Sequence, residues 1–209
     1  MKKVALLGKG SLAIKIGKWL DASKDFNLTK VIPNVPEPKW TESLSEWAYK
    51  EGFHVPDSGD YKEFRPEYID IVLSVFYDRI IDKEFIGRCK CIVNLHNAPL
   101  PKYRGVSPIN WALKNNESYH GVTIHKISPG IDDGDILGKI TYPIYPEIEE
   151  VEDVYKKSLD YGYELFKDVF TKFDYSFENA KSQEGKVIYK HSGENKFLGN
   201  RKSWTRYES

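Results

Sequence analysis

The chain has 209 residues, of which 40% are hydrophobic and 30% are charged, so it can form a packed core. Its 31 basic side chains balance its 31 acidic ones, which argues against a general nucleic-acid scaffold. No apolar run approaches a membrane span, and the basic start has too few apolar residues for a signal peptide. Cys89 and Cys91 have neither disulfide nor metal-cluster spacing. We expect them to be buried thiols, which fits a reducing compartment and a cytoplasmic protein.

The first elements predict a Rossmann-like α/β fold with an open, mostly parallel sheet. An apolar strand at residues 4–7 leads into the Gly-Lys-Gly-Ser turn at residues 8–11, and apolar positions at helical spacing follow. The turn has two interpretations. Its backbone N–H groups and Lys9 could hold a phosphate, or it could simply pack the helix on the strand. Ala13 breaks the GxGxxG pattern and the nearest acidic residue, Glu37, lies in a proline-rich loop, so a dinucleotide is not indicated.

The other elements follow from apolar periodicity and turn residues. Further strands are expected at residues 26–31, 53–55, 69–75, 91–93, 120–127, 136–144 and 185–190. Helices are expected at residues 12–20, 41–51, 82–87, 107–115 and 148–172, with Thr41 and Ser107 as N-caps. Loops are expected at residues 33–38 and 61–66. The strands at 120–127 and 136–144 should pair antiparallel across a tight turn.

The domain organisation is predicted to be one α/β domain at residues 1–180 with a C-terminal extension at residues 181–209. The extension is rich in basic and aromatic side chains, including Trp204 and Tyr207. It could pack back on the domain and offer cations to an anionic substrate, or it could be solvated.

Two polar residues follow the short apolar strand at residues 91–93. Because strand side chains alternate, Asn94 and His96 should point to the same face. An amide beside an imidazole at the carboxyl end of a strand suits an active site, since ligands of open α/β sheets bind there. The alternative is a strand end whose polar groups meet water or backbone. Prolines and Gly105 then predict a rigid, irregular loop.

An acidic turn carries Asp132, Asp133 and Asp135. Three carboxylates so close together could bind Mg²⁺ or Ca²⁺, but their spacing is not that of an EF-hand loop. We therefore expect no metal site.

The central stretch resembles the formyltransferase family that uses 10-formyltetrahydrofolate. Four motifs carry the resemblance in order, namely N-L-H-N-A-P-L-P-K-Y-R-G at 94–105, S-P-I-N-W-A-L at 107–113, H-G-V-T-I-H at 120–125 and G-I-D-D-G-D-I-L at 130–137. The resemblance extends more loosely over residues 1–145. It departs at residues 97–99, where relatives often carry a small residue, Ser and Leu, and this should alter the loop but not the chemistry.

The resemblance implies catalysis by Asn94, His96 and Asp132. These residue types suit an amine that attacks a formyl carbonyl: Asn94 can donate to the developing oxyanion, and His96 can donate to it or handle the amine proton. A nearby Asp132 would favour the imidazolium form of His96. By the same resemblance the folate would be bound around Arg79, Ile80, Ile81, Ser128, Gly130 and Asp132.

The acceptor is inferred from the subfamily that the loop resembles. Tyr-Arg-Gly followed by Pro-Ile-Asn-Trp is similar to the sugar N-formyltransferases. We therefore expect formylation of the 4-amino group of a dTDP-linked 4-amino-4,6-dideoxy sugar, as in lipopolysaccharide O-antigen biosynthesis. The substrate contacts expected are Lys9, Ser11, Tyr103, Arg104 and Trp111.

The sequence also bears on other acceptors and on macromolecular partners. Initiator-tRNA enzymes carry a further basic domain that this sequence does not show, so we expect no nucleic-acid partner. A membrane partner is not expected either, and a homodimer is compatible with the sequence. The alternatives are phosphoribosylglycinamide formylation and a non-catalytic nucleotide-binding module.

Overall fold

The computed structural model describes residues 1–198, which form two compact units. The first unit contains residues 1–95 and 126–129, and the second contains residues 96–125 and the described residues from 130 onward. The predicted extension at residues 181–209 remains a prediction. Its residues 199–209, with Trp204 and Tyr207, lie outside the described part.

The first unit is a parallel sheet with helices. Its elements are β1 (Lys2–Gly8), α1 (Gly10–Asp21), β2 (Phe26–Pro33), α2 (Leu44–Lys50), the 3₁₀ helices η1 (Tyr61–Glu63) and η2 (Pro66–Tyr68), β3 (Ile71–Val75), α3 (Lys83–Arg88) and β4 (Ile92–His96), whose last residue belongs to the second unit. The strand order is β2-β1-β3-β4, and every pair is parallel. The predicted strand, turn and helix at the start of the chain are thus confirmed.

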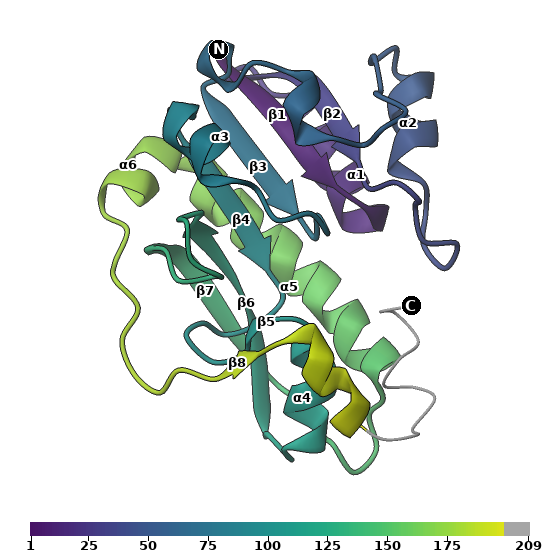
Figure 1. Ribbon diagram of the computed structural model, residues 1–209, viewed down its shortest axis with the longest axis vertical. Helices are drawn as coiled ribbons and strands as arrows, with labels where there is room; N and C mark the ends of the chain where they lie inside the picture. Colours follow the sequence, from purple (N-terminus) through teal and green to yellow (C-terminus); the bar gives the residue numbers. More distant parts are fainter. Residues whose placement is uncertain (199–209) are drawn as a thin grey trace. The chain divides into compact units, whose positions relative to one another are not determined.

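Apolar side chains on both faces explain the central strands of this unit. Residues Val4 to Leu7 of β1 and Ile71 to Val75 of β3 are buried, as expected for parallel strands covered on both sides. Helix α1 lies beside β1 and β2 (Figure 1). Gly17 of α1 allows the ring of Trp47 to approach, because a Cβ at that position would lie 2.5 Å from the ring.

Several local predictions in this unit were wrong. Pro33 was expected in a loop but ends β2, an outer strand of the order, where a missing N–H is tolerated. The N-cap of α2 is Ser43 and not Thr41, because the Ser43 hydroxyl accepts from the Glu46 N–H at 3.0 Å. Residues 53–55 form no strand, and η1 and η2 replace the loop predicted at residues 61–66.

The second unit combines an antiparallel hairpin, a short parallel strand pair and helices. Its elements are β5 (Arg104–Gly105), α4 (Pro108–Lys114), β6 (Tyr119–Lys126), whose last residue belongs to the first unit, β7 (Ile136–Pro143), α5 (Val151–Thr171), α6 (Phe173–Glu178), β8 (Tyr189–Lys190) and η3 (Ser192–Phe197). The predicted antiparallel pairing of β6 with β7 is confirmed. Figure 1 shows β8 beside β5, and these two strands are parallel. Within residues 1–198 the structure is therefore α/β, with mostly parallel strand pairs and the antiparallel pair of β6 and β7.

Helix α5 provides the apolar surface of this unit. Val154, Leu165, Val169 and Phe170 are buried, and the helix packs on β7 and α4. The helix predicted at 148–172 is confirmed as α5, which begins three residues later and ends at Thr171, and α6 follows it. The strand predicted at residues 185–190 is confirmed only for β8.

The two cysteines are free thiols. Neither Cys89 nor Cys91 forms a disulfide, and both are half-buried instead of buried as predicted. Burial raises the pKa of the Cys89 thiol to about 12. Within residues 1–198 no helix has both the length and the apolar character needed to cross a bilayer.

Candidate active site

His96 stands at the end of β4, two residues after Asn94 on the same strand. Its side chain is 8% exposed. Its Nε2 lies 2.9 Å from the main-chain oxygen of Tyr103. Because a carbonyl oxygen can only accept, Nε2 carries a proton and donates. The other ring nitrogen, Nδ1, lies 3.7 Å from Oδ2 of Asp132. The cationic form of His96 would therefore have an acceptor near each ring nitrogen.

Asp132 lies between two histidines and a backbone amide. Besides its approach to His96, its Oδ1 lies 3.5 Å from Nε2 of His125, and its Oδ2 accepts from the Gly105 N–H at 2.8 Å. Burial disfavours the carboxylate and is the largest single influence on its pKa. The two histidines and the Gly105 amide together outweigh burial and hold the pKa of Asp132 below its usual range. The side chain is thus an anion in a largely enclosed place.

The loop that follows His96 has an unusual backbone. Tyr103 and Ser107 have φ values of 60° and 55°, and Asp132 has a φ of 48°. Residues other than glycine rarely adopt this left-handed conformation, and such strain is concentrated at functional sites. Gly105 has a φ of 90°, and a Cβ there would lie 2.1 Å from the Lys190 oxygen. The pairing of β5 with β8 therefore requires glycine at this position.

Three further groups around Asp132 were not predicted from the sequence. His125 is 2% exposed and approaches the carboxylate, although only its place in the H-G-V-T-I-H motif pointed to it. The Gly105 amide was missed because a backbone donor leaves no trace in residue type. Gln183 donates to the Asp132 oxygen at 2.8 Å from far along the chain, and no local pattern indicates this contact.

The residues predicted to bind folate occur in both units. Arg79, Ile80, Ile81 and Ser128 belong to the first unit, and Gly130 and Asp132 belong to the second. In the first unit, Ile81 belongs to a buried cluster on which Ile127 also packs. The residue before Ser128 and the segment of Ile81 therefore meet at one cluster. Ile80 is 78% exposed in an irregular segment, whereas the Arg79 guanidinium lies 3.6 Å from Asp60.

The predicted phosphate contacts at the first turn have partners within the protein. Nζ of Lys9 lies 2.7 Å from Oδ1 of Asp78. The backbone N–H of Lys9 donates to the Val75 oxygen at 3.3 Å, and that of Ser11 donates to Oγ1 of Thr41 at 3.3 Å. A phosphate would have to compete with these contacts, so substrate binding by Lys9 and Ser11 remains a prediction.

The other predicted substrate residues lie in the second unit. The Tyr103 side chain is 1% exposed, and its hydroxyl donates to Glu117 at 2.8 Å and accepts from Asn115 at 3.0 Å. The ring is thus buried, while the Tyr103 carbonyl lies next to His96, and substrate binding by Tyr103 remains a prediction. Trp111 is 4% exposed, with Lys190 over its ring at 3.9 Å. The Arg104 guanidinium donates to Gln183 at 3.0 and 2.7 Å.

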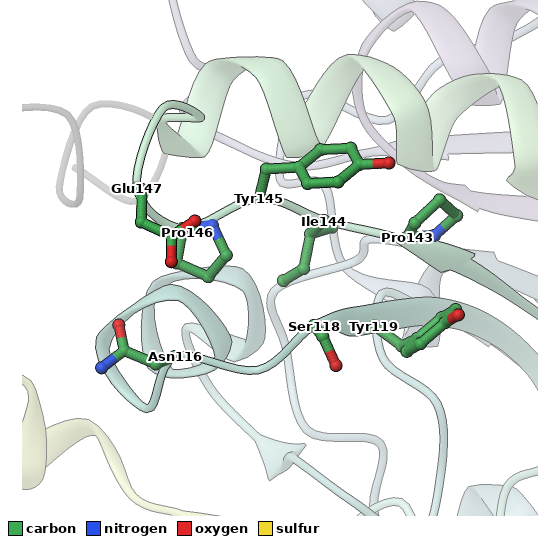
Figure 2. Close-up of a pocket in the computed structure, with 8 residues that line it drawn as sticks. All are labelled: Asn116, Ser118, Tyr119, Pro143, Ile144, Tyr145, Pro146 and Glu147. Atoms are coloured by element: carbon green, nitrogen blue, oxygen red, sulfur yellow. The ribbon is translucent and has the colours of Figure 1, made fainter.

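Metal ligands and surface hollows are two other features that could mark a site. Within residues 1–198 no group of three or more His, Cys, Asp or Glu side chains is arranged to hold a metal ion. A hollow of about 270 Å³ lies where β6 begins and β7 ends, between the rings of Tyr119 and Tyr145 (Figure 2). His125 lies near the other end of β6, and Asp132 lies in the turn that precedes β7. The hollow therefore contains none of the predicted catalytic residues.

Comparison with known proteins identifies the family. Residues 43–170, more than half of the chain, match the formyl transferase family. The chain belongs to this family. The matched region contains Asn94, His96 and Asp132 and all four motifs of the resemblance.

Solved structures of sugar-modifying formyltransferases have the same fold. An N-formyltransferase from Helicobacter canadensis, in complex with folinic acid and dTDP-3-aminofucose, has a TM-score of 0.78 and 27% identity. The match covers 92% of this chain and 72% of that one. WlaRD, a sugar 3N-formyltransferase with dTDP and 5-N-formyl-THF, has the same TM-score and identity, over 93% of this chain and 71% of its own. The predicted fold class is confirmed.

The curated relatives carry a different acceptor in their name. A methionyl-tRNA formyltransferase from Fervidobacterium nodosum is 35% identical over 156 residues. The match covers 69% of this chain and 50% of the relative. The chain thus spans about half the length of this curated relative.

Proposed function

We propose that this formyl transferase family member moves a formyl group from 10-formyltetrahydrofolate to the amino group of a nucleotide-linked sugar. The observation that carries the proposal is the enclosed Asp132 carboxylate, 3.7 Å from Nδ1 of His96 and bonded by the Gly105 amide. Asn94 precedes His96 by two residues on β4. Together these residues provide the donors and the anion that acyl transfer to an amine requires.

The reaction follows from these groups. The lone pair of the acceptor amine attacks the formyl carbon, and the carbonyl electron pair moves to oxygen. The Asn94 amide donates to that oxyanion, and the loss of one such donor typically lowers the rate about 100-fold. The bond from the formyl carbon to N10 of the folate then breaks. N10 gains a proton and the new formamide nitrogen loses one, so tetrahydrofolate and the N-formyl sugar result.

His96 has a defined part in these steps. Its Nε2–H donates to the Tyr103 oxygen, so it must exchange that acceptor for the oxyanion or for the group that carries the moving proton. Asp132 stabilises the ring when it is positively charged, because its carboxylate is close to Nδ1 and is kept ionised. His96 is therefore a donor oriented from one side by a carboxylate.

The residues of the first unit suit a flat, polar-edged heterocycle such as the pterin of folate. Ile80 presents an open apolar side chain in a segment without helix or strand, so backbone groups lie beside an apolar surface. The two similar structures described above contain folate derivatives. Folate as the formyl donor agrees with both observations.

The proposed acceptor is a dTDP-linked 4-amino-4,6-dideoxy sugar. The similarity to two sugar enzymes over more than nine-tenths of this chain supports a nucleotide sugar. One of those two proteins is described with a 3-amino sugar and the other as a 3N-formyltransferase. The 4-amino position therefore rests on the resemblance of the sequence and is proposed separately from the nucleotide sugar.

Methionyl-tRNA is the second candidate acceptor. The observation that favours it is the 35% identity to a methionyl-tRNA formyltransferase, which exceeds the identity to the sugar enzymes. The shared region is the formyl transferase family region, whose chemistry is the same for every amine. Identity there therefore bears on the formyl donor more than on the acceptor.

One assay separates these acceptors. The purified protein is mixed with 10-formyltetrahydrofolate and, in parallel, with dTDP-4-amino-4,6-dideoxyglucose, a dTDP-3-amino sugar, glycinamide ribonucleotide or methionyl-tRNA, and tetrahydrofolate release is followed. We expect the highest kcat/KM with the 4-amino sugar. Preference for the 3-amino sugar would overturn the 4-amino position and keep the nucleotide sugar as the acceptor. Turnover with methionyl-tRNA or the ribonucleotide alone would overturn the sugar, and no turnover with any amine would overturn formyl transfer.

A further inference from the structure

A segment far along the chain runs beside the loops that form the site. Residues 181–190 are attached at both ends within the second unit. Lys181 exchanges backbone hydrogen bonds of 2.7 and 2.9 Å with Ile136, and β8 pairs with β5 (Figure 1). Gln183 lies between these two attachments. It is the only glutamine of the chain.

The amide of Gln183 connects two loops at once. Its nitrogen donates to the main-chain oxygens of Asp132 and Gly134, both at 2.8 Å. Its oxygen accepts from Nε and Nη2 of Arg104 at 3.0 and 2.7 Å. Both halves of the side chain are thus satisfied, and each half contacts a different loop.

The same segment also orients the donor that reaches Asp132. On one edge of β5, the N–H groups of Arg104 and Val106 donate to the oxygens of Ile188 and Lys190 at 2.8 and 3.1 Å. Because N–H groups alternate along a strand, the Gly105 N–H points to the opposite edge. There it donates to the Asp132 carboxylate at 2.8 Å. Asp132 is therefore held at its side chain through β8 and β5, and at its backbone by Gln183.

Asp132 needs such support. Its φ of 48° is a left-handed conformation that residues other than glycine adopt at a cost, and it persists only where neighbouring groups determine it. The hydrogen bond from Gln183 to its oxygen supports this conformation directly. A shift of its carboxylate would change the approach to His96, and a displacement of about 1 Å at a reacting group can cost 100-fold in rate.

We propose that Gln183 is a positioning residue for formyl transfer, which holds the Asp132 turn and the Arg104–Gly105 strand in register. This inference rests on the proposed function, and it adds residues 181–190 to the site. Gln183 acts through Asp132 and Gly105 and is not assigned contact with either substrate. Its loss should lower kcat and leave both KM values largely unchanged.

Two variants and a control test the proposal. Gln183→Leu removes the hydrogen bonds to Asp132 and Gly134 as well as those from Arg104. Gln183→Glu keeps an acceptor for Arg104 but places a carboxylate where the amide nitrogen donates to two carbonyl oxygens. Glu184→Ala changes the exposed neighbour on the same segment and should match the wild type. The readouts are kcat and KM for each substrate, and amide hydrogen exchange in peptides that cover residues 103–106 and 130–135.

We expect Gln183→Glu to lower kcat at least 10-fold, to change each KM less than about threefold, and to speed exchange at residues 130–135. Gln183→Leu should speed exchange in both peptides. Unchanged exchange, or a rise in the KM for the amine without a fall in kcat, would overturn the proposal. If Gln183→Leu does not fold, Gln183→Glu decides alone. If the wild type transfers no formyl group, the proposed function fails, while hydrogen exchange still tests whether Gln183 holds the Asp132 turn and the Arg104–Gly105 strand.

Discussion

Two buried histidines of the second unit have the same kind of partner at Nε2 and differ in what lies near Nδ1. His96 and His120 each place Nε2 2.9 Å from a backbone oxygen of the proline loop, that of Tyr103 and that of Asn97. Nδ1 of His96 faces the Asp132 carboxylate at 3.7 Å. Nδ1 of His120 is buried and has no hydrogen-bond partner among the residues that the structure describes. Burial lowers the pKa of His120 to about 4, so this ring is neutral near pH 7.

The difference shows how one residue type serves two purposes. A histidine between a carbonyl and a carboxylate can carry a positive charge and donate from both nitrogens, whereas a histidine with one acceptor and apolar surroundings remains neutral. The rings of Tyr103 and Tyr142 lie against His120 and exclude water. Under the proposed function, His96 takes part in the chemistry and His120 has a structural role.

Substitution of each histidine should separate these roles most clearly. We expect His96→Asn to lower kcat about 1000-fold, within the range for loss of a general acid or base. His120→Gln keeps a donor for the Asn97 oxygen and should leave kcat within about threefold of the wild type. Steady-state tetrahydrofolate release at pH 7.5 measures both. A His96→Asn enzyme within a few-fold of wild type would remove His96 from catalysis.

Acid should destabilise the protein through His120. Its pKa is about 4 when folded and near 6.5 in an unfolded chain, so the unfolded state binds the proton first. The stabilisation is complete above pH 6.5 and is lost as the pH falls towards 4, on the order of 3 kcal/mol in all. Below that window Asp132, whose pKa is lowered, adds a further loss.

Urea unfolding of wild type and His120→Gln at several pH values tests this expectation. The wild type should lose stability between pH 6.5 and 4, and the variant should lose markedly less, because glutamine does not titrate. His96 and Glu117 are the charged neighbours that also influence this pKa, and both are present in each protein. Equal slopes in the two proteins would show that another group causes the acid sensitivity.

The sequence predicted the parts of the site that local patterns encode. The alternation of β4 indicated that Asn94 and His96 share a face, and the motif with Asp132 was recognisable because it is contiguous. The hairpin of β6 and β7 followed from two apolar strands around a tight turn. These predictions depend on residues close together in the chain.

What escaped prediction depends on long-range contacts. Gln183 reaches Asp132 across the fold, and the Gly105 amide is a backbone group that any residue could supply. Ser43 replaced Thr41 as the helix cap because Thr41 instead accepts from the Ser11 N–H, a contact between distant segments. The motif around Tyr103 gave no sign that packing would bury its ring.

Gly105→Ala should disturb the surroundings of Asp132, and so of His96, while leaving those of His120 intact. The new Cβ would collide with the Lys190 oxygen, so β5 must move away from β8 and carry its amide away from Asp132. We expect a loss of about 2 kcal/mol in unfolding free energy and a lower kcat. Gly185→Ala is the matched control, because Gly185 also has a positive φ, 103°, but nothing lies within 4 Å of its Cβ position. Equal effects in urea unfolding and kinetics would mean that backbone strain, not the collision, is responsible.

Tyr103→Phe should have the smallest effect, because the carbonyl next to His96 is retained. The lost hydroxyl donates to the Glu117 carboxylate and accepts from Asn115, and a hydrogen bond to a charged group contributes about 1.5 kcal/mol at the low end of its range. The Glu117 carboxylate keeps its contact with Lys102 at 3.1 Å, so it is not left buried without a partner. We expect a small loss of stability in urea unfolding and a KM for the nucleotide sugar within about twofold of wild type. A tenfold rise in that KM would show that the hydroxyl reaches the substrate when the loop moves, and would place Tyr103 beside His96 in function as well as in structure.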